Sequence, residues 1–163
     1  MRLALITLAA VAIAAPAAAQ DERAAIDAVL DDLHAAAARA DGPAYWALYA
    51  PDAVFVGTDA SERWTLAQFK AYADPHFNQG KGWSYTPRDR QVTFAAIECR
   101  CVAWFEETLD SASYGTTRGT GVLVKGEGGW KIGQYSLSIP VPNDIAEDLT
   151  AQIKAFEAAA PKP

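Results

Sequence analysis

Residues 102–139 constrain the fold of this chain more than any other stretch. They read as the greater part of three long antiparallel strands joined by two turns, at residues 97–109, 114–125 and 130–139. A glycine-rich run at 126–129 marks the second turn, because consecutive glycines favour turns over strands. Pro140 and Pro142 then stop the sheet. We therefore expect everything upstream to pack onto this sheet or to close a cavity against it.

Helices precede the strands. Apolar residues recur at helical spacing over residues 21–40 and predict one amphipathic helix, and a short aromatic-rich helix follows at 44–49. A buried strand is expected at 53–57, and the capping-box sequence Thr65 to Gln68 starts another helix at Leu66. Residues 83–94 predict a further strand before the three long ones. This order, helices first and then a meander, indicates an α+β fold.

The first residues form a segment of their own. Arg2 supplies a short positive region, an apolar run follows, and Ala17 and Ala19 offer an A-x-A cleavage site. This pattern is typical of a cleavable signal peptide. We therefore expect a signal peptide at 1–20, one domain at 21–140, and a C-terminal helix and tail at 141–163. The predicted location is periplasmic or secreted.

The composition of the chain argues against several classes of binding partner. The formal net charge of −6 and the pI near 4.8 argue against nucleic acid, which requires a basic patch. The same acidic balance, and the lack of a later apolar stretch of spanning length, argue against a membrane role after signal cleavage. Two separated histidines and scattered acids predict no metal site and no cofactor.

Cys99 and Cys101 are the only cysteines. Residues i and i+2 of a regular strand lie roughly 6.5–7 Å apart at Cα, which is the edge of what a disulfide tolerates. We therefore expect two buried free thiols, with a local disulfide at a bulge or an inter-subunit bond as alternatives. Two further ligands would be needed for a metal site and are not evident.

Several stretches together resemble a known superfamily. They are the helix pair leading into YAPDAVFVGTD, the run ERWTLAQFKAY, and the ordered set AWFEETL, RGTGVLVK and GWKIGQYSLSIP. This set resembles the SnoaL-like branch of the nuclear-transport-factor-2-like superfamily, which has the cystatin-like α+β fold. The resemblance implies a strongly curved antiparallel sheet wrapped around the N-terminal helices, a conical pocket, and often a homodimer.

The resemblance also implies a range of functions, because members include dehydratases, isomerases, cyclases, small-molecule binders and interaction domains. Catalytic members usually place an Asp or Glu base, or an Asp–His pair, in the cone. This chain departs from that pattern: many relatives carry a histidine near Ser136, whereas here the strand reads GQYSLS. Its own histidines, His34 and His76, lie in helical segments.

Arg118 and Glu107 are the first candidate ligand contacts. If residues 110–113 form a four-residue loop, Phe105 faces Arg118 and Glu107 is its diagonal neighbour, whereas a loop one residue longer or shorter substitutes Glu106. We prefer Glu107. A carboxylate and a guanidinium amid apolar walls can orient an organic ligand, or can form a structural ion pair.

The remaining candidates are a base and a set of wall residues. Glu107, His34 and Asp59 are the candidate catalytic groups, each with a structural explanation open beside the catalytic one: an ion pair, a satisfied histidine or a solvated turn. Aromatic and polar side chains are expected to line the cavity. They are Trp46, Tyr49, Trp64, Trp83, Trp130 and Gln134.

Three functions remain open. The first is a pocket that binds a small, partly apolar organic molecule. The second is a cofactor-independent lyase or isomerase with a pocket carboxylate as general base. The third is a dimeric interaction domain without catalysis. A His–carboxylate contact inside the pocket would favour the enzyme.

Overall fold

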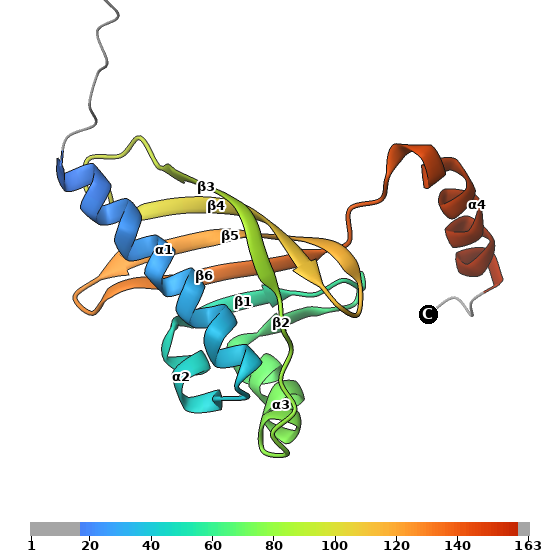
Figure 1. Cartoon of the computed structure of the whole chain (residues 1–163), viewed down its shortest axis with the longest axis horizontal. Coiled ribbons are helices and arrows are strands. Elements are labelled where there is room, and N and C mark those ends of the chain that lie inside the picture. Colours follow the sequence, from blue (N-terminus) through green and yellow to red (C-terminus); the bar gives the residue numbers. More distant parts are fainter. Residues whose placement is uncertain (1–16, 160–163) are drawn as a thin grey trace, which may run out of the picture.

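The computed structural model describes residues 17–159, so most of the predicted signal peptide lies outside the described residues (Figure 1). Four helices and six strands follow one another along the described chain. The helices are α1 (Ala17–Ala38), α2 (Gly42–Ala47), α3 (Leu66–Phe77) and α4 (Asn143–Ala159). The strands are β1 (Tyr49–Val56), β2 (Arg63–Thr65), β3 (Thr86–Phe94), β4 (Val102–Ser111), β5 (Gly115–Gly126) and β6 (Gly129–Ser138).

The strands form one six-stranded sheet in the order β2-β1-β6-β5-β4-β3. All neighbours pair antiparallel except β1 and β6, which run parallel. The three long strands predicted from the sequence form the meander β4-β5-β6 in the middle of this order. The α+β fold class is therefore confirmed as a largely antiparallel sheet with helices.

Helix α1 crosses one face of the sheet, and α2 and α3 lie together at one end of it (Figure 1). The predicted apolar stripe of α1 is buried, with Ile26 and Leu30 fully covered and Leu33 3% exposed. Thr65 caps α3 as the sequence indicates, because its hydroxyl accepts the N–H of Gln68 while the Gln68 side chain accepts the N–H of Thr65. We call the face under α1 the inner face of the sheet and the opposite side the outer face.

The two cysteines form a disulfide, so the preferred prediction of free thiols is wrong. The expected strand at 97–109 begins only at Val102, and both cysteines lie in the turn between β3 and β4. Arg100, between them, adopts a left-handed backbone with φ of 47°. This turn brings the two Cα atoms to 5.1 Å, which is closer than a regular strand allows.

Helix α4 differs from the other helices because none of its residues is buried. It stands apart from the sheet beyond residues 139–142 (Figure 1). Three of its large apolar side chains are exposed: Ile145 at 52%, Ile153 at 47% and Phe156 at 76%. Among the described helices, none is long and apolar enough to cross a membrane.

Candidate active site

A cavity of about 270 Å³ lies between the inner face of the sheet and helices α1 and α3. Its walls come from segments far apart in the sequence, and more than half of the lining side chains are aromatic. The lining residues are Leu33, His34, Ala37, Tyr45, Phe55, Gly57, Thr58, Glu62, Trp64, Phe69, Tyr72, Trp83, Tyr85, Ser113, Tyr114, Tyr135 and Leu137. This is a concave, mostly apolar site with a few polar groups, as small-molecule sites usually are.

His34 on α1 lines this cavity and contacts Glu107 on β4, which lies outside the lining. The distance from His34 Nε2 to Glu107 Oε1 is 2.8 Å, and both residues are buried. The Tyr135 hydroxyl donates to the same carboxylate oxygen at 3.3 Å. Sequence analysis named His34 and Glu107 separately, and the structure brings them together.

Arg90 on β3 holds the other oxygen of Glu107. Its Nε donates to Glu107 Oε2 at 2.8 Å, and its Nη1 lies 2.9 Å from Asp31 and 3.4 Å from Asp27 on α1. The Arg90 side chain is 9% exposed. Because both oxygens of Glu107 are engaged and the network continues to α1, the carboxylate is held in one position between helix and sheet.

Burial alone raises the pKa of Glu107, but the hydrogen bonds from His34 and Arg90 and the positive charge of Arg90 outweigh it and hold this pKa below its ordinary value. Burial, followed by the Glu107 charge, raises the pKa of Tyr135 well above its ordinary value. Glu107 is therefore an anion and Tyr135 a neutral phenol at neutral pH. An ionised carboxylate can only accept, so the hydrogen of this contact sits on His34 Nε2.

This arrangement fixes the chemistry that His34 can perform. With a hydrogen on Nε2, the neutral imidazole carries its lone pair on Nδ1. A proton taken up at Nδ1 would create an imidazolium, and the adjacent Glu107 carboxylate would stabilise its charge. His34 is thus arranged as a general base or acid, with Glu107 as the group that orients it.

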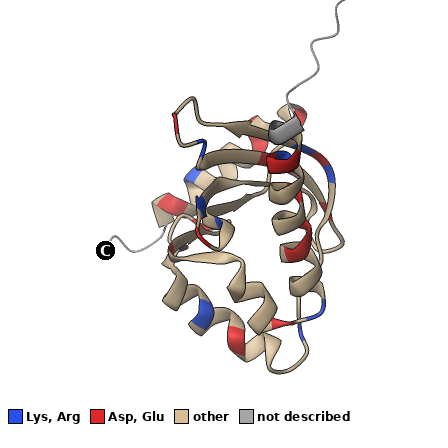
Figure 2. Ribbon diagram, turned by 90° about the vertical axis from the view of Figure 1, so that its left-hand side faces the viewer, with Lys and Arg blue, Asp and Glu red and all other residues tan. Residues whose placement is uncertain are grey.

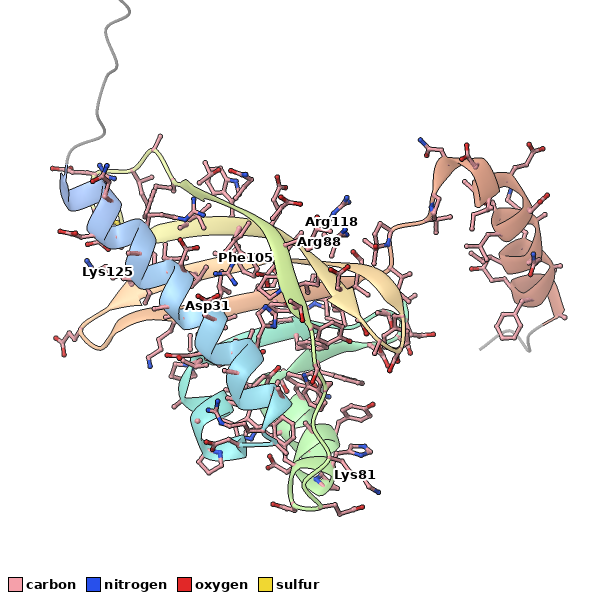
Figure 3. All side chains as sticks on the ribbon, in the orientation of Figure 1. Asp31, Lys81, Arg88, Phe105, Arg118 and Lys125 are labelled. Carbon is pink, nitrogen blue, oxygen red and sulfur yellow. A yellow bond between two sulfur atoms is a disulfide. The ribbon has the colours of Figure 1, made fainter. Side chains whose placement is uncertain are left out.

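Arg118 does not join this site, so the predicted Arg118–Glu107 pairing is wrong. The β4–β5 loop spans residues 112–114, and Phe105 pairs with Gly121 instead of Arg118, three positions further along β5. An odd shift moves a side chain to the other face of a strand. Glu107 therefore pairs with Gly119 on the inner face, while Arg118 is exposed and points, like Arg88, away from α1 (Figure 3).

The prediction that Gln134 lines the cavity is also wrong, because it assumes regular alternation along β6. Val122 pairs with Gln134 and Leu123 with Ile132, so Gly133 is an extra residue in β6. This bulge shifts the alternation, and the inner face continues with Tyr135 and Leu137 while Gln134 is exposed.

The predicted aromatic wall divides into two groups. Trp64 and Trp83 line the cavity. Trp46, Tyr49 and Trp130 lie outside its lining and are satisfied by the protein: Trp46 Nε1 donates to Asp74 at 2.7 Å, the Tyr49 hydroxyl bonds that of Tyr45 at 3.0 Å, and Trp130 Nε1 donates to Glu22 at 2.7 Å. Their ligand-binding role is not supported by these positions.

Asp59 lies outside the lining as well. It is exposed and accepts hydrogen bonds from the backbone and hydroxyl of Ser61, which lower the pKa of its carboxyl. Glu62, three residues further along the chain, does line the cavity. The solvated-turn explanation therefore fits Asp59.

Sequence reasoning missed Arg90 and Tyr135. Arg90 alternates with Val92 and Phe94 along β3, and this apolar alternation could have placed it on the inner face. Tyr135 could not be found in the same way, because the bulge at Gly133 breaks the alternation of β6. Within residues 17–159, no group of three or more His, Cys, Asp or Glu side chains could hold a metal ion.

Solved structures share this fold at low sequence identity. An NTF2-like protein of unknown function from Pseudomonas putida has a TM-score of 0.61 and 17% identity, covering 79% of this chain and 92% of that chain. A candidate dehydratase from the NTF2-like family of Streptomyces avermitilis has a TM-score of 0.64 and 12% identity, covering 76% and 99%. A domain of unknown function with a cystatin-like fold from Nostoc punctiforme has a TM-score of 0.61 and 16% identity, covering 85% of this chain and 94% of that chain.

The family of this chain is identified by comparison of its sequence with a family model. Among curated proteins, none matches this chain. The family model of the SnoaL-like domain matches residues 26–142, which include the buried part of α1, the whole sheet and the cavity between them. This chain therefore belongs to the SnoaL-like domain family, with the nuclear-transport-factor-2-like, cystatin-like fold.

Proposed function

We propose that this protein binds a small, partly apolar organic molecule in its cavity and moves a proton on that molecule with His34. The reaction class is a cofactor-independent lyase or isomerase reaction that begins at a carbon next to a carbonyl group. The contact between His34 and Glu107 at the cavity wall carries the proposal, because it is the His–carboxylate pair that an enzyme of this kind requires.

The cavity supports the binding part of the proposal. Its volume of about 270 Å³ suits a molecule of one or two rings, and its walls are mostly aromatic. Trp64 and Trp83 supply flat apolar surfaces, and Tyr85 and Tyr114 supply hydroxyl groups. The conical pocket implied by the family resemblance belongs to the same proposal.

The site residues support the proton transfer as follows. His34 Nδ1 accepts a proton from the substrate carbon, and Nε2–H remains bonded to Glu107. Glu107 stays ionised, because Arg90 holds its second oxygen. His34 then returns the proton to another carbon in an isomerisation, or to a leaving hydroxyl, which departs as water, in a dehydration. In our proposal Glu107 is a positioning residue, which replaces the general-base role predicted for a pocket carboxylate.

Binding is tested first with naphthol as the probe and tryptophan fluorescence as the signal. Trp64→Ala removes a lining ring and should weaken naphthol binding about tenfold. Trp104→Ala is the matched control, because Trp104 is 49% exposed on the outer face. Equal affinity in both variants would sink the assignment of this cavity as the binding site.

Catalysis is tested with a panel of small cyclic β,γ-unsaturated ketones and β-hydroxy ketones, whose products are conjugated enones that absorb in the ultraviolet. His34→Gln should lower the rate by about 100-fold or more, since a positioned general base contributes about that much. His76→Gln is the control, because this exposed histidine lies outside the lining. A panel turned over equally by both variants would remove His34 from the mechanism.

We also propose that the protein is exported, with cleavage before Gln20 or Asp21. The apolar leader and the Cys99–Cys101 disulfide support this, because disulfides persist in oxidising compartments. The intact mass of the protein from the periplasm or culture medium checks it, and a mass that includes the leader would contradict it.

A homodimer is proposed from the family resemblance and from the exposed Trp104 on the outer face of the sheet. Mass spectrometry under native conditions tests it and reports any retained small molecule in the same spectrum. A monomer at micromolar concentration would contradict the dimer, while leaving the cavity proposal unaffected.

A further inference from the structure

The residues that line the cavity include a negatively charged side chain and no lysine or arginine. The negative side chain is that of Glu62, which contributes a carboxylate to the wall. Arg90, which holds the second oxygen of Glu107, is also engaged by Asp31 and Asp27 on α1. Acidic positions also follow one another along α1, in a chain of net charge −6 (Figure 2). An anionic ligand would meet repulsion here without a fixed cation to offset it.

Glu62 is held in place at the cavity wall. Its Oε2 accepts the backbone N–H of Asp59 at 3.2 Å, and its side chain lies against Gly57, where a Cβ atom would fall 2.1 Å from Oε2. Glu62 is partly buried, and no lysine, arginine or histidine of the described chain forms an ion pair with it. It is therefore a positioned carboxylate with capacity for a positive partner.

Aromatic rings surround the same part of the cavity. Trp64 on β2 and Tyr72 on α3 lie 4.9 Å apart between ring centroids, and both line the cavity with Tyr85 and Tyr114. Tyr72, Tyr85 and Tyr114 come from α3, the segment before β3 and the β4–β5 loop, and the lining of the cavity brings them together. The negative faces of such rings attract cations, including quaternary ammonium groups that cannot donate hydrogen bonds.

We propose that the ligand of this cavity is an organic cation, a protonated or quaternary amine seated against Trp64 and Tyr72 with Glu62 as its counter-ion. The proposal rests on the proposed function, because it assigns the ligand class of the same cavity. The ammonium group lies at the Glu62 side, and the remainder of the molecule extends toward His34. An aromatic wall with one carboxylate distinguishes such a cation from a neutral molecule of the same shape by its charge.

Three probes of nearly equal shape test this: benzyltrimethylammonium, the neutral alcohol dimethylbenzylcarbinol, and the anion phenylacetate. Calorimetric titration at pH 7 should show the cation binding about tenfold more tightly than the alcohol, because cation–aromatic attraction and a counter-ion both act on it. Phenylacetate should bind at least tenfold more weakly than the alcohol. Added salt should weaken the binding of the cation and leave the binding of the neutral alcohol unchanged, because screening acts only on charged ligands.

Glu62→Gln and Glu106→Gln form the matched pair of variants. Both remove one negative charge, but Glu106 lies on the outer face and is exposed. Glu62→Gln should reduce the preference for the cation over the alcohol about three- to tenfold, and Glu106→Gln should leave it unchanged. Circular dichroism of both variants checks that they fold.

Each remaining outcome overturns the proposal in a distinguishable way. If the alcohol or phenylacetate binds as tightly as the cation, the ligand is not selected by charge, while the cavity remains a binding site. If all three probes fail to bind and naphthol also leaves tryptophan fluorescence unchanged, the proposed function fails together with the cation. If Glu106→Gln lowers the preference as much as Glu62→Gln, net charge rather than this site attracts the probe.

Discussion

Glu106 and Glu107 are adjacent in β4, yet they lie in two different environments. Glu107 is 2% exposed on the inner face, where His34, Tyr135 and Arg90 engage both of its oxygens. Glu106 points to the outer face and is exposed, opposite Gln91 and Thr120 on the neighbouring strands. Because the residue type is the same, the difference shows that the face of the sheet decides whether a carboxylate is part of a site.

Other residue types repeat this contrast. Arg90 is 9% exposed within the Glu107 network, whereas Arg118 is exposed and forms no ion pair with any residue that the structure describes. Trp64 lines the cavity, whereas Trp104 is 49% exposed on the outer face. The outer face therefore supplies a matched control for each inner residue.

Among the comparisons between the two faces, Glu107→Ala and Glu106→Ala should show the largest difference in the free energy of unfolding. Loss of Glu107 leaves the Nε–H of the buried Arg90 and the His34 ring without their acceptor, and such a change typically costs about 3–5 kcal/mol. Glu106→Ala should change the free energy of unfolding by less than about 0.5 kcal/mol. Urea unfolding at pH 7 measures both values, and similar losses would contradict the division between the faces.

Arg90→Leu compared with Arg118→Leu should give the second largest difference. Leucine at position 90 leaves Glu107 without the donor to its second oxygen, but His34 and Tyr135 remain, so we expect a loss of about 2–3 kcal/mol. Arg118→Leu should stay within about 0.5 kcal/mol of the original protein. Thermal unfolding compares the stability losses of the two variants. A larger loss for Arg118→Leu would mean that Arg118, not Arg90, forms the structural ion pair.

Gly119 and Gly133 allow the addition of a single methyl group next to the Glu107 site and away from it. A Cβ atom at Gly119 would lie 2.3 Å from the Tyr135 hydroxyl and 3.1 Å from Glu107 Oε1, so Gly119→Ala pushes against the site. Overpacking of this kind costs about 1–3 kcal/mol. At Gly133 the nearest atom is 3.6 Å away, and Gly133→Ala should change stability by less than about 0.5 kcal/mol.

The Gly119→Ala variant also has a spectroscopic readout. The nitrogen resonances of His34 report its hydrogen bond to Glu107, and they should shift in Gly119→Ala but not in Gly133→Ala. Unchanged resonances together with a lower stability would mean that the methyl group displaces Tyr135 alone.

The elements of this fold follow from local patterns, and the site depends on registers that those patterns do not contain. The stripe of α1, the capping box at Thr65 and the glycine-rich turn at 126–129 were sufficient to predict helices, strands and the α+β class. Arg118 was misplaced because the number of loop residues between β4 and β5 sets the register, and one strand sequence fits several loops equally well.

Two local distortions account for most of the remaining differences. The bulge at Gly133 reverses the alternation of β6 and substitutes Tyr135 for Gln134 on the inner face. The left-handed backbone of Arg100 makes the disulfide possible. Neither residue type requires the conformation it adopts. The contact between His34 and Glu107 joins residues 73 positions apart, so only the packed structure could place them together.

The smallest effect is the contribution of Glu107 to the pH dependence of the free energy of unfolding. The folded protein holds the pKa of Glu107 below its ordinary value of 4.5, so Glu107 stabilises the fold above that pH, and this contribution is lost as the pH falls through the folded pKa. The stability difference between the original protein and Glu107→Gln should therefore be constant from about pH 6 to pH 5 and shrink below pH 4.5, by about 1.4 kcal/mol for each unit of lowering.

Glu106→Gln is the matched control, because Glu106 is exposed on the outer face and forms no ion pair with a residue that the structure describes. The pKa of Glu22 is also lowered, by its hydrogen bonds with Lys125 and Trp130. Because both proteins contain Glu22, its contribution cancels when the stability of Glu107→Gln is subtracted from that of the original protein. A Glu107 difference that stays constant down to about pH 3 would mean that the carboxyl titrates alike in folded and unfolded chains. In that case the contacts from His34 and Arg90 would not hold the anion, and the inner face would lose the charge that orients the imidazole.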